Sequence, residues 1–146
     1  MLKIPKWVLI SFICLSFAGF LDASYLTVKH YTQGIVPCYF FESCQQVTTS
    51  KYSVVAGIPV SLAGALYYLT ILIVSILFLD TENKKLFQFL GYLPTLGLIA
   101  SSYFLYIQAV ILKEFCSYCV LSAIFSIILF VLSLKMLGLQ RNSKRP

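Results

Sequence analysis

The stretch Lys113-Glu-Phe-Cys-Ser-Tyr-Cys-Val-Leu-Ser122 places a Cys-x-x-Cys pair, Cys116 and Cys119, directly between two long apolar runs. One run covers about residues 86–112, and the other begins at the pair and continues to Leu134. Each run is about as long as a membrane-crossing helix, which needs about 20 mostly apolar residues. The stretch therefore predicts a tight turn between two transmembrane helices. The dithiol is expected at the membrane edge, on the first turn of the second helix.

Lipid must be the solvent for most of this chain. Of its 146 residues, 60% are hydrophobic and only 11% are charged, and the mean hydropathy is +0.89. Soluble domains carry about 25% charged residues. The net charge of +6 does not indicate nucleic-acid binding, because the basic residues cluster at the ends of the apolar runs, as membrane topology requires. The length suits a single domain over residues 1–146.

Four apolar stretches are long enough to span a membrane, at about residues 7–28, 58–79, 86–112 and 115–134. They predict an all-α integral membrane protein, a four-transmembrane-helix bundle. The links at residues 80–85 and 113–114 are short, so the helices that they join are expected to be antiparallel neighbours.

The segment between the first two spans, residues 29–57, is a long outer loop that is rich in aromatic residues. Loops of this length are usually functional or disordered. We expect residues 48–56 to form a short interfacial helix, with Thr48 or Thr49 as its N-cap and Gly57-Ile-Pro59 as its end. Pro59 suits the first turn of the second span, where a backbone donor is not needed.

Basic residues predict the orientation of the bundle. Eight of them share one side of the predicted topology: Lys3, Lys6, Lys84, Lys85, Lys135, Arg141, Lys144 and Arg145. The other side has three, partly offset by Glu42 and Glu114: Lys29, Lys51 and Lys113. The positive-inside rule then places both termini in the cytoplasm and the loop cysteines at the outer face of a plasma or inner membrane, where disulfides persist. The alternative for the first stretch is a signal peptide cleaved near Ala23-Ser24, which would leave three spans.

Cys116 and Cys119 share one face of the expected helix and have a spacing that suits a disulfide. At a helix N-terminus, unpaired N–H groups and the helix dipole stabilise a thiolate, which makes such a pair reactive. The alternative is half of a zinc site, but zinc usually takes two close ligand pairs. Cys38 and Cys44 are more widely spaced than that, and the single histidine lies outside both pairs. The pattern therefore favours redox chemistry without a metal.

Four further residues need an interpretation, and more than one is open for all of them except Cys14. Cys38 and Cys44 could form an inert structural disulfide, or a mobile loop pair that exchanges electrons with the Cys-x-x-Cys pair. Asp22 is the only acidic residue inside a predicted span and lies toward its outer end. It is a functional candidate by default, or else a partner for a hydroxyl group or a residue of the wet interface. Cys14, in mid-span, is expected to be a small apolar filler.

Several motifs together resemble the vitamin K epoxide reductase family in its prokaryotic, DsbB-like branch. They are Asp22-Ala-Ser-Tyr-Leu-Thr27, Cys44-Gln-Gln-Val-Thr-Thr-Ser50, Gly57-Ile-Pro-Val-Ser-Leu-Ala-Gly64 and Cys116-Ser-Tyr-Cys119. The resemblance covers about residues 11–134. It implies a four-helix bundle that holds a quinone, of the ubiquinone or menaquinone type, near the outer leaflet.

The resemblance also implies a role for each site residue. Cys119 would face the quinone, and Ser50 would donate a hydrogen bond to a quinone carbonyl. Cys116 would accept electrons from Cys44 through a transient disulfide, and Cys38 would be attacked by the thiol of a partner. The redox pairs would be Cys38–Cys44 and Cys116–Cys119.

Two departures from the family pattern matter. Prokaryotic members are often fused to a thioredoxin-like domain, whereas this chain ends twelve residues after Leu134, so its partner is expected to act in trans. The vertebrate enzymes carry an Asn near the position of Ser53 and a Thr-Tyr-Ala run soon after the Cys-x-x-Cys, where this chain has Val120-Leu-Ser-Ala123. That difference argues against vitamin K epoxide as the substrate.

The leading hypothesis is a membrane thiol–quinone oxidoreductase that re-oxidises a secreted thioredoxin-fold (DsbA-like) partner and so supports disulfide-bond formation. An alternative is a reductase of vitamin K or its epoxide. A second alternative is a non-catalytic membrane scaffold with structural disulfides. A carrier of electrons across the membrane fits least, because only Cys14 lies near mid-span.

Overall fold

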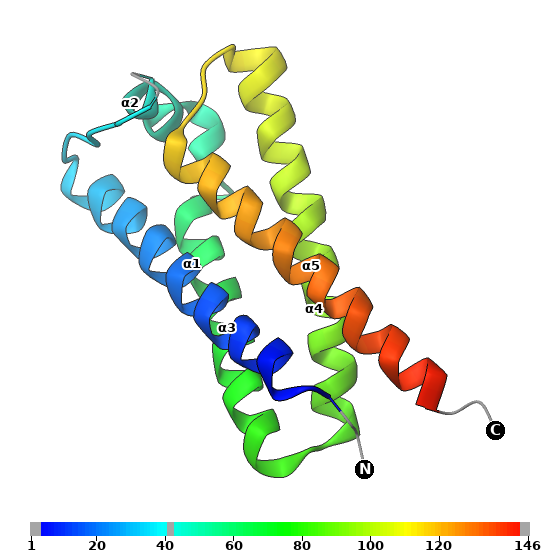
Figure 1. Cartoon of the computed structure of the whole chain (residues 1–146). Coiled ribbons are helices and arrows are strands. Elements are labelled where there is room, and N and C mark those ends of the chain that lie inside the picture. The colour runs from blue at the N-terminus through cyan, green and yellow to red at the C-terminus, as the bar shows by residue number, and fades with distance from the viewer. Residues whose placement is uncertain (1–3, 41–42, 144–146) are drawn as a thin grey trace.

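Four long helices form the protein (Figure 1). The computed structural model describes residues 4–40 and 43–143. The helices are α1 (Lys6–Thr32), α3 (Val60–Thr81), α4 (Lys84–Tyr106) and α5 (Ser117–Ser143), and a π-helical turn, η2 (Ile107–Leu112), extends α4. All four are long and apolar enough to cross a membrane. The predicted four-helix membrane bundle is therefore confirmed.

Both ends of the bundle are defined by short connections. α1 begins and α5 ends at the end of the bundle that also holds the α3–α4 link, while α2 (Cys44–Thr49) and the α4–α5 turn lie at the opposite end (Figure 1). Glu82 stops α3 in the left-handed conformation, at φ 44°. The Asn83 side chain then accepts a hydrogen bond from the Lys85 N–H and starts α4 as its N-cap. The link is thus two residues long.

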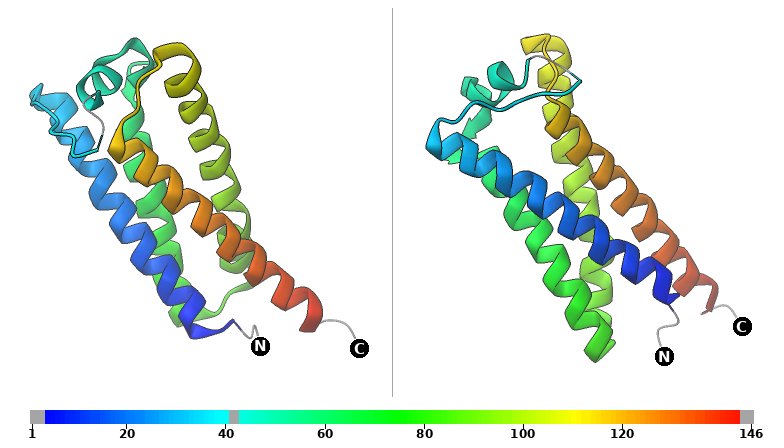
Figure 2. Two further views of the ribbon diagram at one scale, coloured as in Figure 1. Left: turned by 45° about the horizontal axis from the view of Figure 1, so that its top comes forward. Right: turned by 60° about the vertical axis from the view of Figure 1, so that its left-hand side comes forward.

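Close packing holds α1 along α3 and α4 along α5 (Figure 2). A Cβ on Gly19 of α1 would lie 2.6 Å from the Tyr68 ring of α3, and a Cβ on Gly91 of α4 would lie 2.8 Å from Leu137 of α5. Both glycines therefore permit a close approach of two helices. Tyr68 and its neighbours form the main core of the bundle, which includes Phe12, Ile71, Phe87, Leu90, Leu129 and Met136.

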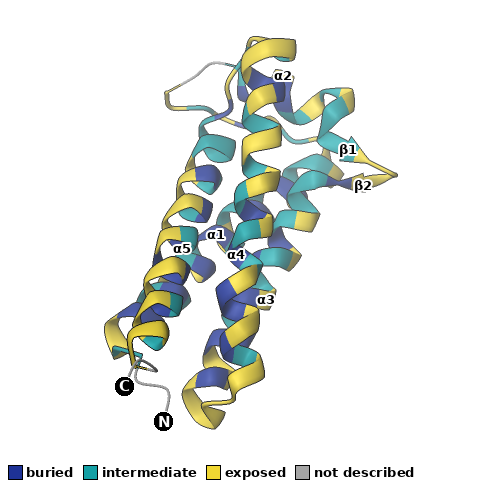
Figure 3. Cartoon of the chain, turned by 90° about the vertical axis from the view of Figure 1, so that its right-hand side faces the viewer, coloured by how far each residue is buried: buried dark blue, intermediate teal, exposed yellow. Residues whose placement is uncertain are grey.

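Large apolar side chains cover the outside of the helices, where Figure 3 shows exposed residues along each of them. Trp7, Ile10, Phe17 and Leu21 on α1 are all more than half exposed. An aqueous protein rarely exposes apolar patches of this extent. This distribution is expected when hydrocarbon surrounds the bundle.

The outer segment differs from the predicted helix at residues 48–56. Instead, α2 ends at Thr49 and a 3₁₀ turn, η1 (Lys51–Ser53), follows; two strands, β1 (Val54–Val55) and β2 (Ile58–Pro59), then pair antiparallel. The helix prediction was wrong because Ser50 is extended and because Ala56 and Gly57 both have positive φ, at 52° and 80°. Two consecutive residues of this kind make a two-residue hairpin turn.

Two details of the capping prediction were also wrong. Thr48 lies inside α2, where its hydroxyl donates to the Cys44 carbonyl at 2.8 Å, so neither Thr48 nor Thr49 begins a helix. Ser43 occupies the N-cap position of α2. Pro59 is the N-cap residue of α3 rather than part of its first turn, because its extended backbone still pairs with Val54 in the hairpin.

Candidate functional site

The Cys-x-x-Cys pair lies at the N-terminal end of α5. Cys116 immediately precedes the helix, and its carbonyl accepts the first helical hydrogen bond from the Val120 N–H at 3.0 Å. Cys119 follows in the first turn. Cys116 is fully buried, whereas Cys119 is half-buried. The two sulfurs therefore have different surroundings even though they share one helical turn.

The surroundings of Cys116 favour its thiolate. A hydrogen bond from the Cys119 thiol lowers the pKa of Cys116 to about 7, and the backbone at Cys119 and Tyr118 contributes in the same direction. Burial and the nearby charge of Asp22 oppose this shift. Amide groups at a helix N-terminus stabilise negative charge in this way. Cys116 is consequently suited to act as a leaving group in thiol–disulfide exchange, since thiols of low pKa leave faster.

Gln108, in the π-helical turn, holds the backbone of the residues that lead into α5. Its side-chain Oε1 accepts a hydrogen bond from the Cys116 N–H at 3.1 Å. Its backbone carbonyl accepts one from the Glu114 N–H at 3.1 Å, and Lys113 turns the chain with φ 53°. Gln108 is only 3% exposed. π-helical turns often occur at functional sites, and this one positions the backbone of a candidate catalytic cysteine.

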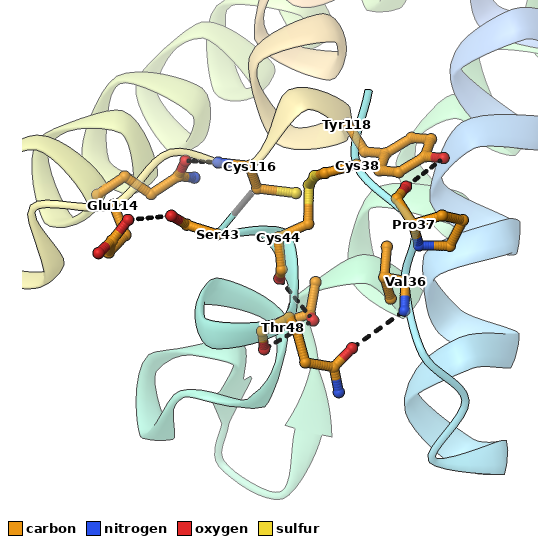
Figure 4. The surroundings of a disulfide bond; sticks show 11 residues. Val36, Pro37, Cys38, Ser43, Cys44, Thr48, Glu114, Cys116 and Tyr118 are labelled. Atoms are coloured by element: carbon orange, nitrogen blue, oxygen red, sulfur yellow. Dashed lines mark hydrogen bonds between the residues drawn. A yellow bond between two sulfur atoms is a disulfide. The ribbon is translucent and has the colours of Figure 1, made fainter. Parts of the chain in front are cut away.

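Cys38 and Cys44 form a disulfide whose Cα atoms are 5.9 Å apart. Cys44 begins α2 and is fully buried, whereas Cys38 lies in the preceding loop. The sulfur of Cys116 points toward this disulfide in Figure 4. Cys44 and Cys116 belong to one buried cluster, and Cys38 packs against it. The loop pair therefore meets the helix pair on the Cys116 side.

Hydrogen bonds hold the loop against the helices. The Val36 N–H donates to the Gln45 side chain at 3.0 Å, and the Tyr118 hydroxyl donates to the Pro37 carbonyl at 3.2 Å. The Ser43 hydroxyl donates to the Glu114 carboxylate and so ties α2 to the α4–α5 turn (Figure 4). The bonded residues include Val36 and Pro37, which precede Cys38, and Ser43, which precedes Cys44, so the chain is held in place next to each cysteine of the disulfide.

A largely apolar cavity of about 340 Å³ lies within the bundle beside Cys119. Its volume is within the range of small-molecule sites, about 300–1,000 Å³. All four long helices and the outer segment contribute to its wall, with residues that include Leu26, Val47, Ser50, Leu96, Phe104 and Ser122. Cys119 lines this cavity and Cys116 does not. The pair thus links the loop disulfide on one side to the cavity on the other.

The comparisons with known proteins agree with this arrangement. The model of the vitamin K epoxide reductase family matches residues 10–134. The chain belongs to this family. It is also similar to the thiol-disulfide oxidoreductase LTO1 of Arabidopsis thaliana, with 34% identity over 129 residues. That match covers 82% of the chain but only 34% of the relative, so the chain spans about a third of the length of this curated relative.

In this member of the vitamin K epoxide reductase family, the structure brings together all five residues singled out for the site. Cys44 and Cys116 belong to one buried cluster, Cys38 and Cys119 pack against it, and Ser50 lines the cavity. The Ser50 hydroxyl donates to the Val47 carbonyl at 2.8 Å. Its oxygen can still accept a second bond, or it can turn toward a ligand.

Other residues differ from expectation or were missed. Cys14 is exposed on α1, so it faces outward rather than filling the core as predicted. Gln108 was missed; the one signal that could have found it is an amide inside an apolar span, and Gln88 gives the same signal. Tyr67 was also missed. Its hydroxyl lies buried at the cavity and has no hydrogen-bond partner among the residues that the structure describes.

Proposed function

We propose that this chain is a membrane thiol–quinone oxidoreductase, built as a single domain of the vitamin K epoxide reductase type. The observation that carries this proposal is the position of the Cys-x-x-Cys pair: Cys116 contacts the loop disulfide cluster, and Cys119 lines the cavity. Electrons entering at Cys38 have an unbroken sulfur path to the cavity. A structural scaffold would not need a second dithiol at the end of that path.

Electrons enter at the loop disulfide. A thiolate of the partner attacks the Cys38 sulfur and breaks the Cys38–Cys44 bond; the partner's second thiol then releases Cys38. The partner leaves as a disulfide, and Cys38 and Cys44 become thiols. Tyr39 and Phe40, beside Cys38, are 87% and 88% exposed. Exposed aromatic residues are common anchors of protein interfaces, so they support a partner that docks at Cys38.

Transfer within the chain is a second exchange. The Cys44 thiolate attacks the sulfur of Cys116 in a Cys116–Cys119 disulfide, which releases Cys119. Cys38 then attacks Cys44 and expels Cys116 as a thiolate, a step that its low pKa favours. The products are a Cys38–Cys44 disulfide and two thiols at Cys116 and Cys119. The structure has this distribution of bonds.

The cavity suits a quinone as the electron acceptor. It is largely apolar, Cys119 is at its wall, and two polar groups facing it, Asp22 Oδ2 and the Tyr67 hydroxyl, have no hydrogen-bond partner in the described chain. A bound quinone would supply a two-electron, two-proton acceptor. The protein's part is to hold Cys119 beside it, offer hydrogen bonds and exclude water. Oxidation of the two thiols re-forms the Cys116–Cys119 disulfide and releases two electrons and two protons.

The orientation of the bundle follows from charge. The end at which α1 begins and α5 ends holds Lys6, Lys84, Lys85, Lys135 and Arg141; Lys3, Lys144 and Arg145, also assigned to this side, lie outside the described residues. The cysteine end has fewer basic residues, so the positive-inside rule places it outside the cell or in an equivalent oxidising compartment. We infer a plasma or inner membrane with both termini cytoplasmic and a secreted, DsbA-like partner.

A trapping experiment tests the entry step. In a Cys44→Ser variant, the Cys38 thiolate should open the disulfide of an oxidised, purified DsbA-like protein and remain linked to it. Mass spectrometry should find the adduct on Cys38, and a Cys14→Ser change should not alter its yield. The proposal fails if the adduct is absent, or if it forms equally in a variant that also lacks Cys38.

A further inference from the structure

Asp22 is a half-buried acid that the steps above do not use. It lies on α1, whereas the other described acidic residues lie at the end of α3 and in the short turns: Asp80, Glu82 and Glu114. Glu42 lies outside the described residues. The Asp22 Oδ2 atom is buried and has no hydrogen-bond partner within residues 4–40 and 43–143. Burying an unpaired carboxylate is costly, and an ionisable residue inside a membrane usually has a function.

Asp22 faces the same cavity as Cys119. It is also close enough to the helix pair for its charge to act on Cys116, whose pKa an ionised Asp22 raises. Loss of a proton from Asp22 therefore disfavours the Cys116 thiolate, and the reverse holds as well. The carboxyl group and the dithiol are coupled through the field inside the cavity, where charges are weakly screened.

The groups around Asp22 leave its proton available. On α3, the Tyr68 hydroxyl donates to the Ser122 carbonyl at 2.7 Å and contacts two serine hydroxyls, so it is already engaged. Tyr67, also on α3, has a hydroxyl without a hydrogen-bond partner in the described part of the chain. The other titratable groups that line the cavity are His30 on α1, Tyr52 in η1 and Cys119 on α5.

Helix α4 and the π-helical turn contribute only uncharged residues to the cavity wall, among them Gln108, Ser101 and Leu105. No lysine or arginine is among the described lining residues. A carboxyl group in such surroundings has no cation to hold it as a carboxylate, so it is suited to carry a proton and to give it to a ligand.

We propose that Asp22 is the acid that delivers a proton to an oxygen of the quinone in this cavity and recovers one from the cysteine pair. This inference rests on the proposed function. The overall change is balanced: two thiols and a quinone become a disulfide and a quinol. Two electrons and two protons leave Cys116 and Cys119, and two of each arrive at the quinone. Asp22 gives one proton as the electrons arrive and takes one that the thiols release, so it is unchanged over the cycle.

An Asp22→Asn variant tests this role, since the amide keeps the shape but has no proton to transfer. With purified protein in lipid nanodiscs and decylubiquinone as the probe, infrared difference spectra should show a protonated carboxyl band that moves when the quinone binds. The band should vanish in Asp22→Asn and persist in Asp80→Asn, an exposed acid at the end of α3. If the Asn variant does not fold, the wild-type spectrum alone still tests the proposal, since it shows whether a carboxyl band responds to the quinone.

Kinetics give the second measurement. Oxidation of the pre-reduced Cys116–Cys119 pair by decylubiquinone should slow by about 10²-fold or more in Asp22→Asn, in line with the usual size of acid catalysis. The rate should keep only the pH dependence that titration of Cys116 contributes. A Tyr67→Phe variant should weaken quinone binding and keep the pH profile of the wild type.

The inference is overturned if Asp22→Asn reacts at the wild-type rate with the same pH profile, or if no carboxyl band responds to quinone. These results leave the proposed function standing, because the dithiol is still oxidised. If wild-type protein neither binds quinone nor loses its thiols to it, the proposed function itself is wrong.

Discussion

Replacement of Gln108 by leucine removes one hydrogen-bond acceptor and little volume. The acceptor bonds the Cys116 N–H at 3.1 Å, and both residues are buried, at 3% and 0% exposure. The change leaves an N–H group in an apolar environment without water or another described partner. Leaving a buried donor unsatisfied costs about 1–3 kcal/mol. We therefore expect Gln108→Leu to lower the free energy of unfolding by this amount, or to open the α4–α5 turn locally.

Hydrogen exchange measures this effect directly. The amide of Cys116 should exchange about 5- to 150-fold faster in Gln108→Leu, because about 1.4 kcal/mol corresponds to a factor of ten. Gln88→Leu is the matched control, since Gln88 lies exposed on the same helix. Gln108→Glu keeps an acceptor for the Cys116 N–H and should restore protection. Unchanged exchange at Cys116 in Gln108→Leu would refute the assigned role of this hydrogen bond.

Two further predictions concern the same end of the protein and the helix packing. The Cys119 thiol lowers the pKa of Cys116 to about 7, so thiolate absorbance at 240 nm in the reduced protein should appear as the pH rises through about 7. Cys119→Ala should move this transition to higher pH. An unmoved transition would contradict the assigned cause of the shift. Gly19→Ala should destabilise the bundle by about 1–3 kcal/mol through overpacking, because the added Cβ would lie 2.6 Å from the Tyr68 ring. Gly138→Ala is the control: its added Cβ would have nothing within 4 Å, so it should be neutral or slightly stabilising. Thermal unfolding in detergent compares the two, and equal effects would refute the packing argument.

The four spans could be predicted because lipid imposes a simple requirement on the chain. A helix that crosses hydrocarbon must satisfy its backbone internally and present apolar side chains over about 20 residues. Hydropathy alone locates such segments, but it does not locate their ends. α5 continues to Ser143, beyond the predicted end at Leu134, because a helix can extend into water past Lys135. α1 likewise continues to Thr32.

The outer segment could be predicted less well because no single periodicity governs it. Val54 and Val55 favour strand, and the Ala56-Gly57 turn requires positive φ at two residues, but an alanine there gives little warning. The position of Asp22 toward the outer end of its span was readable from its place in the chain. Its buried oxygen at a cavity was not, since that depends on how α3 and α5 pack around it.

The asymmetry between Cys116 and Cys119 was an expectation drawn from family resemblance. Spacing alone treats the two cysteines alike. The difference arises from tertiary structure: α2 and the loop cover Cys116, while the gap among α1, α3, α4 and α5 reaches Cys119. The roles assigned to the two sulfurs remain proposals that mutagenesis can separate.

The most direct test of the proposed electron path is the stoichiometry of quinone reduction. Protein with its cysteines pre-reduced is mixed anaerobically with decylubiquinone, the loss of quinone absorbance is followed, and the disulfides formed are mapped by mass spectrometry. We predict one quinone reduced for each disulfide formed, hence two for each wild-type chain as both cysteine pairs close, with no reaction in Cys119→Ser and one quinone for each chain in Cys38→Ser. Formation of the disulfide without loss of quinone, or undiminished quinone reduction in Cys119→Ser, would contradict the assignment.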